Sequence, residues 1–152
     1  MVLKRILITL DTESDQWQDT LIETALNIAS PADATVYVLF VFPNEEYDEL
    51  QSAITVDSRQ GTLSPDDLAS RLDGMQSLSD QFDTHDIDFE VRGIGGGIPA
   101  DQIVRKATEL DIDLLLVGGK QRSPAGKAVF GDRAQQILLQ TPCSVVYVRQ
   151  DL

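Results

Sequence analysis

Apolar residues along the chain gather into five short runs, and between these runs apolar positions recur every three or four residues. The first run, at residues 3–10, is interrupted only by two basic residues and a threonine, which is typical of a strand buried on both faces. Four further runs predict four more strands. The five predicted strands lie at residues 3–10, 34–42, 87–91, 113–117 and 143–148.

The segments between these runs carry helical signals. Ser14 is a good capping residue for the first helix, and Pro99 opens a later one. At 64–67 a capping serine, a proline and two carboxylates predict a helix start, and one apolar face continues from there to Phe82. The predicted inward positions are Trp17, Leu21, Ala25 and Ile28 in the first helix, Leu68, Leu72, Met75, Ser79 and Phe82 in the second, Ile103, Val104, Ala107 and Leu110 in the third, and Ala134, Ile137 and Leu138 in the last, at 132–140.

Strand and helix therefore alternate along the chain, which predicts an α/β fold with a five-stranded parallel, doubly wound sheet and helices on both faces. At 152 residues the chain has the size of a single domain, 1–152. Residues 43–62 carry no convincing period and are expected to form a long flexible loop. Ligands of such sheets bind at the carboxyl ends of the strands, where the winding direction switches. If the first strand is central, the loops at 11–14 and 118–131 flank this crevice.

The charge of the chain disfavours some classes of partner. It has 25 acidic and 12 basic residues and a formal net charge of −13, a field that repels nucleic acids and anionic membranes, so we expect neither as a partner. An acidic, lysine-poor composition also suits a protein that works in high salt, and a halophilic source is a hypothesis. Cys143 is the only cysteine, so neither an internal disulfide nor a cysteine metal cluster is expected. The start has no signal-peptide pattern and no apolar run approaches about 18 residues, so we expect a cytoplasmic protein.

The loop at 118–131 is the strongest candidate for a ligand site. A glycine-rich loop between a strand and a helix start presents backbone N–H groups to which a phosphate can bind. Lys120, Arg122 and Lys127 also make this loop the densest basic cluster of the chain. Elsewhere, residues 93–98 lack the last glycine of a dinucleotide fingerprint, and His85 has no second histidine or cysteine with which to share a metal. Because the sequence presents no nucleophile with its base, we expect no catalysis beyond slow nucleotide hydrolysis at most.

Gly118 and Gly131, the strand before Gly118, and the ending Thr-Pro-Cys-Ser-Val-Val-Tyr-Val-Arg at 141–149 together resemble the universal stress protein family. Nucleotide-binding members carry Gly-x-x-Gly, nine residues, and then Gly followed by Ser or Thr. In this chain Gly118 and Gly131 match, Gln121 stands at the second glycine, and Asp132 replaces the hydroxyl residue. The resemblance covers nearly the whole chain except residues 43–62.

This resemblance implies a Rossmann-like fold, related to that of the adenine nucleotide alpha hydrolases, and a site for an adenine nucleotide such as ATP or AMP. It implies an adenine-side carboxylate at Asp11, a main-chain contact to the base at Val41, and a homodimer in which the strand at 143–148, which begins at Cys143, pairs about a two-fold axis. The nucleotide-binding residues expected on this basis are Asp11, Thr12, Val41, Gly118, Gly119, Lys120, Gln121, Arg122, Lys127, Gly131 and Asp132.

Asp132 leaves two functions open. A carboxylate about 4 Å from a phosphate oxygen costs roughly 1 kcal/mol in water and about 4 kcal/mol at an effective dielectric constant of 20. The basic residues of the loop, or a Mg²⁺ ion bridging Asp132 to a phosphate, would offset this repulsion and give a regulatory protein with weak or metal-dependent nucleotide binding. Alternatively, Asp132 caps the last helix with its own carboxylate, and the protein is a dimeric adaptor without a nucleotide. Asp11 has the same ambiguity, since it either caps the first helix or accepts hydrogen bonds from a ligand.

Overall fold

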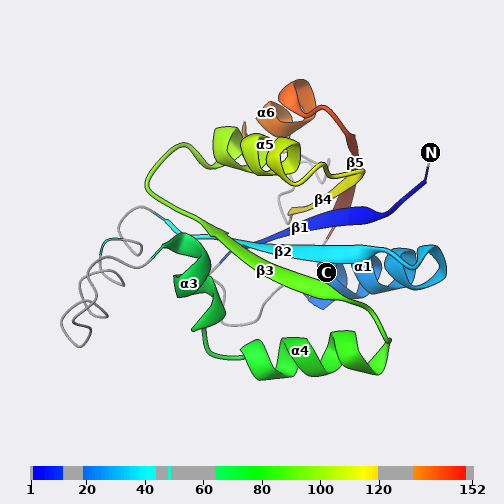
Figure 1. Cartoon of the computed structure of the whole chain (residues 1–152). Coiled ribbons are helices and arrows are strands. Elements are labelled where there is room, and N and C mark those ends of the chain that lie inside the picture. The colour runs from blue at the N-terminus through cyan, green and yellow to red at the C-terminus, as the bar shows by residue number, and fades with distance from the viewer. Residues whose placement is uncertain (1, 12–18, 44–47, 49–63, 120–131, 150–152) are drawn as a thin grey trace, which may run out of the picture.

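Five parallel strands form one sheet in the computed structural model, which describes residues 2–11, 19–43, 48, 64–119 and 132–149 (Figure 1). The strands are β1 (Arg5–Asp11), β2 (Thr35–Val41), β3 (Phe89–Ile94), β4 (Leu114–Gly119) and β5 (Ser144–Arg149). Their order is β3-β2-β1-β4-β5, and each neighbouring pair is parallel. The predicted five-stranded parallel sheet is confirmed, and the first strand is its centre.

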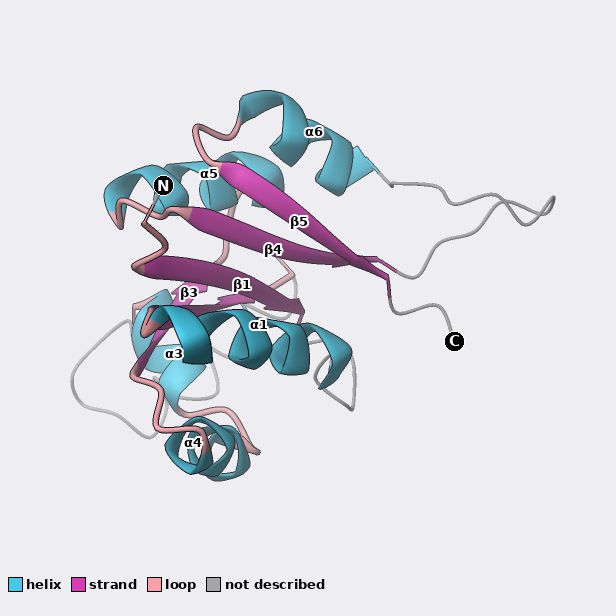
Figure 2. Cartoon of the chain, turned by 90° about the vertical axis from the view of Figure 1, so that its right-hand side faces the viewer, coloured by secondary structure: helices cyan, strands magenta, loops and turns pink. Residues whose placement is uncertain are grey.

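Helices cover both faces of this sheet (Figure 2). They are α1 (Asp19–Ala32), α3 (Pro65–Ser70), α4 (Met75–Thr84), α5 (Pro99–Glu109) and α6 (Asp132–Gln140). Figure 2 shows α5 and α6 on one side of the sheet, and α1, α3 and α4 on the other. The chain therefore winds to one side of β1 through β2 and β3 and to the other side through β4 and β5, which makes the sheet doubly wound, as predicted.

The central strand is buried on both faces, as its nearly continuous apolar run predicted. Ile6, Ile8 and Leu10 of β1 belong to the core that includes the buried residues of α1, α3 and α4. Leu7 belongs to a second core, which includes buried residues of α5 and α6, among them Ile103. Because alternate residues of a strand point to opposite faces, one short segment of sequence contributes to both cores.

The helix expected from 64 to 82 is wrong in one respect, because the structure has two helices there. Its predicted start is correct, since the hydroxyl of Ser64 accepts a hydrogen bond from the Asp67 N–H at 3.2 Å. The first helix, however, ends at Ser70, and Gly74 has a left-handed backbone conformation with φ of 86°. Right-handed helix cannot continue through such a residue, so the chain turns there and starts α4.

The third strand also differs from its prediction at 87–91, because it runs further along the chain. Gly93 and Ile94 belong to β3 and pair with Phe40 and Val41 of β2. The glycine has a packing reason, since a Cβ at Gly93 would lie 2.7 Å from the carbonyl carbon of Pro65. The loop predicted at 43–62 lies outside the described residues except for residues 43 and 48.

Asp113 fixes the central strands to one another at their amino ends. Its Oδ2 accepts hydrogen bonds from the backbone N–H groups of Lys4 and Arg5, at 2.9 and 3.0 Å. The Arg5 guanidinium in turn donates to the carbonyl of Leu110 at 2.7 Å. These contacts hold β1 beside β4 at the end of the sheet opposite the predicted crevice.

Candidate functional site

The strands β1 and β4 are paired at their amino ends but not at their carboxyl ends. Along the described residues, their ladder runs from Ile6–Leu114 to Ile8–Leu116 and stops there. By contrast, β1 remains paired with β2 up to its last residue, and β4 remains paired with β5 up to its own. The sheet therefore parts between its two central strands at the switch point, where the alternating pattern predicted a crevice.

Four of the predicted site residues lie at this edge of the sheet. Asp11 is the last residue of β1 and pairs in register with Val41, the last residue of β2. Gly118 and Gly119 end β4, and both pair with β5 on the side away from β1. The structure thus brings together the carboxylate expected on the adenine side, the main chain expected beside the base, and the start of the glycine-rich loop.

The carboxylate of Asp11 has a partner that the sequence did not suggest. Arg133, the second residue of α6, donates from Nη1 to Oδ1 of Asp11 at 2.6 Å. The two residues are 122 positions apart in the sequence, and their side chains are 42% exposed for Arg133 and 38% for Asp11. An accessible ion pair therefore links the end of β1 to the first turn of α6.

One signal for this contact is present in the sequence. The first turn of a helix carries partial positive charge, so cations are disfavoured there and acids are preferred. An arginine as the second residue of α6 therefore needs a compensating acid nearby. Asp11 supplies such an acid in the folded chain, because α6 begins at the same end of the sheet at which β1 ends.

The other predicted site residues are not placed by the structure. Asp132 is the first residue of α6, but its side chain is not among those described. The remaining members lie outside the described residues, namely Thr12, Lys120, Gln121, Arg122, Lys127 and Gly131. Their roles stay predictions from the sequence.

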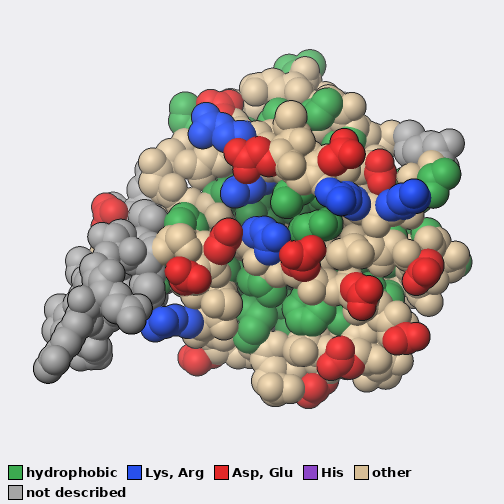
Figure 3. All heavy atoms as spheres, in the orientation of Figure 1, with side chains coloured by type: hydrophobic (Ala, Val, Ile, Leu, Met, Phe, Trp, Pro, Cys, Tyr) green, Lys and Arg blue, Asp and Glu red, His purple; other side chains and the backbone are tan. Residues whose placement is uncertain are grey.

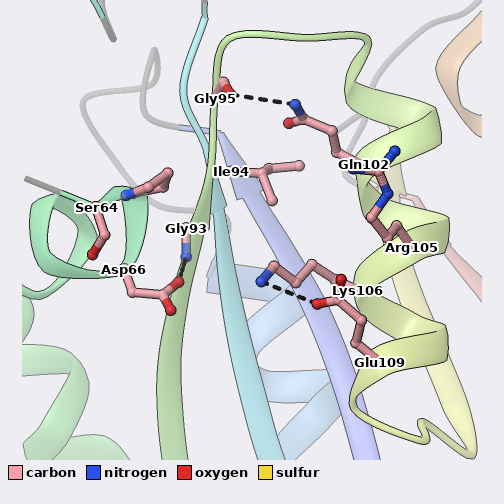
Figure 4. Close-up of a pocket in the computed structure, with 10 residues that line it drawn as sticks. Ser64, Asp66, Gly93, Ile94, Gly95, Gln102, Arg105, Lys106 and Glu109 are labelled. Atoms are coloured by element: carbon pink, nitrogen blue, oxygen red, sulfur yellow. Dashed lines mark hydrogen bonds and ion pairs between the residues drawn. The ribbon is translucent and has the colours of Figure 1, made fainter.

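A cavity of about 350 Å³ lies at the β3 edge of the sheet, between α3 and α5 (Figure 4). Asp66 and Ser64 come from α3 and its cap, and Arg105 comes from α5 on the opposite wall. The cavity is lined by the end of β3, so it lies beyond β2 from the opening between β1 and β4. No pattern in the sequence indicated this cavity.

Most polar groups of this cavity are already paired within its own walls. They form three contacts, Asp66 with the N–H of Gly93 at 2.8 Å, Gln102 with the carbonyl of Gly95 at 3.2 Å, and Lys106 with Glu109 at 3.3 Å. The opening between β1 and β4 is the better candidate site, because it lies at the switch point of the sheet.

Charges on the face seen in Figure 3 are mixed, with basic side chains lying between acidic ones. Two ion pairs of the chain are Arg92 with Glu90, at 3.0 Å, and Lys106 with Glu109 on α5.

Among the described residues, no three His, Cys, Asp or Glu side chains gather closely enough to hold a metal ion. Within the same part of the chain, no helix has the length and apolar character that a membrane span needs.

Comparison with known proteins gives one consistent result. A model of the universal stress protein family matches residues 3–149. A universal stress protein of Mycolicibacterium smegmatis is 32% identical over 63 residues, which cover 41% of this chain and 48% of that protein. The match thus spans about half the length of this relative.

Solved structures agree over nearly the whole chain. Universal stress protein UspA from Lactobacillus plantarum has a TM-score of 0.70 and 22% identity, with 98% of this chain and 99% of that chain covered. The universal stress protein from Archaeoglobus fulgidus in complex with dAMP has a TM-score of 0.63 and 20% identity, with 97% and 99% covered. At these identities the likeness establishes a shared fold.

Proposed function

The chain belongs to the universal stress protein family, whose model matches nearly all of it, and from this premise we propose that it is a regulatory protein that binds an adenine nucleotide, AMP or ATP, between the carboxyl ends of β1 and β4. The observation that carries the proposal is the opening of the ladder between these strands, with Asp11 at its rim. A parallel sheet offers a ligand its best access at such a switch point.

The residues at this edge fit such a ligand. Asp11 is half-exposed, and a carboxylate has acceptor sites for about four hydrogen bonds, so its contact with Arg133 leaves capacity for hydroxyl or amino groups of a nucleoside. Val41 lies one strand away and would contact the base through its main chain. Gly118 and Gly119 allow a close approach of the backbone to the phosphates. The related protein from Archaeoglobus fulgidus, which shares the fold, forms a complex with dAMP.

A second function rests on the same contacts. The carboxylate of Asp11 already accepts from Arg133, and Asp132 begins α6, where an acid is favourable without any ligand. In an adaptor without a nucleotide, these charges would only neutralise one another. This alternative predicts that nucleotide binding appears only after Asp132 is removed.

A homodimer through β5 is part of the proposal. This strand lies at the edge of the sheet next to β4, and its Val145 and Val146 are only half-buried. An edge strand presents backbone groups that native proteins cover or pair. A second copy of β5, related by a two-fold axis, would pair with it and extend the sheet across the dimer.

Calorimetric titration separates the two functions. AMP and ATP, each with and without Mg²⁺, are titrated into the wild type, Asp132→Ser and Glu23→Gln. The last variant removes an equal charge from the exposed surface of α1 and serves as the control. We expect the wild type and the control to bind equally, and Asp132→Ser to bind about tenfold more tightly or better, because a carboxylate near a phosphate costs about 1–4 kcal/mol. Binding only in Asp132→Ser would support the adaptor, and the absence of binding in all three proteins would refute the nucleotide site.

A further inference from the structure

We propose that Arg133 selects ligands that carry a phosphate at this crevice, a role that deepens the proposed function and rests on it. Arg133 lies in the first turn of α6, and its guanidinium reaches Asp11 across the point where β1 and β4 separate. Arg133 therefore places a positive charge at the opening itself. The resemblance to the family assigns no role to this position.

The ion pair with Asp11 is the one recorded contact of the guanidinium among the described residues. Arginine carries five N–H donors in one plane, and the contact with Asp11 is recorded for Nη1 alone. Among the described residues, Arg133 has no second hydrogen bond or ion pair. The side chain is 42% exposed, so a ligand at this edge of the sheet can reach it. A planar guanidinium matches two phosphate oxygens, so a phosphate suits these donors better than a neutral group does.

The pair also positions the guanidinium. A free arginine side chain samples many rotamers, and ordering it for a ligand costs conformational entropy. In this structure the 2.6 Å contact with Asp11 already directs the guanidinium toward the end of β1. Asp11 thus holds the guanidinium at the place where Asp11 itself would also contact the nucleoside. A ligand with both a nucleoside and a phosphate would meet the two halves of one ion pair.

The net charge of the helix start supports the same role. Asp132 adds one negative charge at the first residue of α6, and Arg133 adds one positive charge at the next. Arg133 therefore offsets part of the repulsion that Asp132 alone would exert on a phosphate at this helix start. Of these two residues, only the arginine attracts an anion.

The proposal predicts how ligands are ranked. Adenosine has no charge, so it gains nothing from Arg133 and must share Asp11 with it. AMP has the same nucleoside and adds a phosphate that the guanidinium can bind. The ratio of adenosine to AMP dissociation constants therefore reports on Arg133 separately from the nucleoside part of the site.

The test compares this ratio among the wild type, Arg133→Gln, Arg133→Lys and Arg105→Gln by calorimetry. Arg105→Gln removes the same charge from an exposed position on α5, outside the crevice. We expect Arg133→Gln to weaken AMP about tenfold to a hundredfold, the range for a lost hydrogen bond to a charged group, and to change adenosine by less than about threefold. Arg133→Lys keeps the charge without the planar fork and should fall between, whereas Arg105→Gln should match the wild type.

Inorganic phosphate gives a second measurement that needs no nucleoside. The Nε–H resonance of Arg133, assigned by its loss in Arg133→Gln, should move when phosphate is added and stay in place at the same ionic strength of sodium chloride. Equal weakening of adenosine and AMP in Arg133→Gln, or no response of this resonance to phosphate, would overturn the proposal while leaving the nucleotide site intact. If the wild type binds neither ligand, the proposed function fails, and this inference fails with it.

Discussion

Replacing Gly93 with alanine tests the contact that fixes α3 against the edge of the sheet. The backbone N–H of Gly93 donates to the Asp66 carboxylate at 2.8 Å, which ties β3 to the first turn of the helix. A Cβ at this position would meet the carbonyl group of Pro65, with its carbon 2.7 Å away, and would lie 3.2 Å from the ring of Phe42. Since backbone atoms cannot yield as a side-chain tip can, the start of α3 must move.

The expected cost follows from these two contacts. Overpacking a close-packed site costs about 1–3 kcal/mol, and a hydrogen bond to a charged acceptor, worth about 1.5–3 kcal/mol, is stretched at the same time. We therefore expect Gly93→Ala to lower the free energy of unfolding by about 2–4 kcal/mol.

Gly97→Ala provides a matched control. A Cβ there would meet only the flexible side chain of Gln102, first at its Nε2, and this side chain can turn aside at the loss of its 3.2 Å hydrogen bond to the carbonyl of Gly95. Replacing glycine by alanine also stabilises a compatible position by about 0.4–1 kcal/mol, through the unfolded chain. The free energy of unfolding of this variant should stay within about 1 kcal/mol of the wild type.

Urea unfolding followed by far-ultraviolet circular dichroism measures both variants, at two protein concentrations so that dissociation of a dimer is recognised. A free energy of unfolding for Gly93→Ala within about 0.5 kcal/mol of the wild type, the range of ordinary surface substitutions, would refute the rigid approach of α3 to β3. Equal decreases in the free energy of unfolding of Gly93→Ala and Gly97→Ala would refute it too.

The amino end of the sheet, helix α6, the ion pair and the dimer each give a further prediction. Asp113 accepts two backbone N–H groups at the start of β1, so Asp113→Ala should lower the free energy of unfolding by about 1–3 kcal/mol in the same titration. On α6, Ile137 is 1% exposed and Leu139 is 80% exposed. Ile137→Ala should therefore cost about 2–5 kcal/mol and Leu139→Ala less than about 0.5 kcal/mol, and the reverse order would contradict the face that α6 presents to the sheet. A double-mutant cycle on Asp11 and Arg133 should give a coupling energy of about 0.2–1 kcal/mol in unfolding experiments, and a much larger value would indicate a structural role. Sedimentation equilibrium should give the mass of two chains, and the mass of one chain at every concentration would contradict the homodimer.

Much of the fold could be predicted because its signals are local. Each strand is an apolar run, each crossover carries helical spacing, and their alternation allows few topologies. What the sequence did not reveal depends on contacts between distant segments. Gly93 resembles a loop residue until α3 is packed against it, and Gly74 lies inside an apolar period that spans two helices. In both cases tertiary packing, and not local propensity, decides the conformation.

The candidate site divides in the same way. The positions of Asp11, Val41 and Gly118 follow from topology, since the carboxyl ends of parallel strands share one edge of the sheet. Arg133 could not be paired with Asp11 from the sequence, because the contact joins residues 122 positions apart and exists only after the sheet has formed. Asp132 is therefore not the only charge at the helix start, because Arg133 follows it.

The exposure of the Asp11–Arg133 pair argues that its main effect is on ligands and not on stability. Both side chains are close to 40% exposed, at 42% and 38%, and ion pairs in such surroundings stabilise a fold by at most about 1 kcal/mol. Their interaction with a bound ligand is stronger, because a ligand that covers the pair removes the water that screens it. The effect of salt supports the same conclusion. At about 1 M salt the screening length is roughly 3 Å, so charges in direct contact, such as this pair at 2.6 Å, still interact, while more distant carboxylates do not. The adenosine-to-AMP ratio should therefore depend on Arg133 at every salt concentration, even as the overall field of the acidic surface is lost.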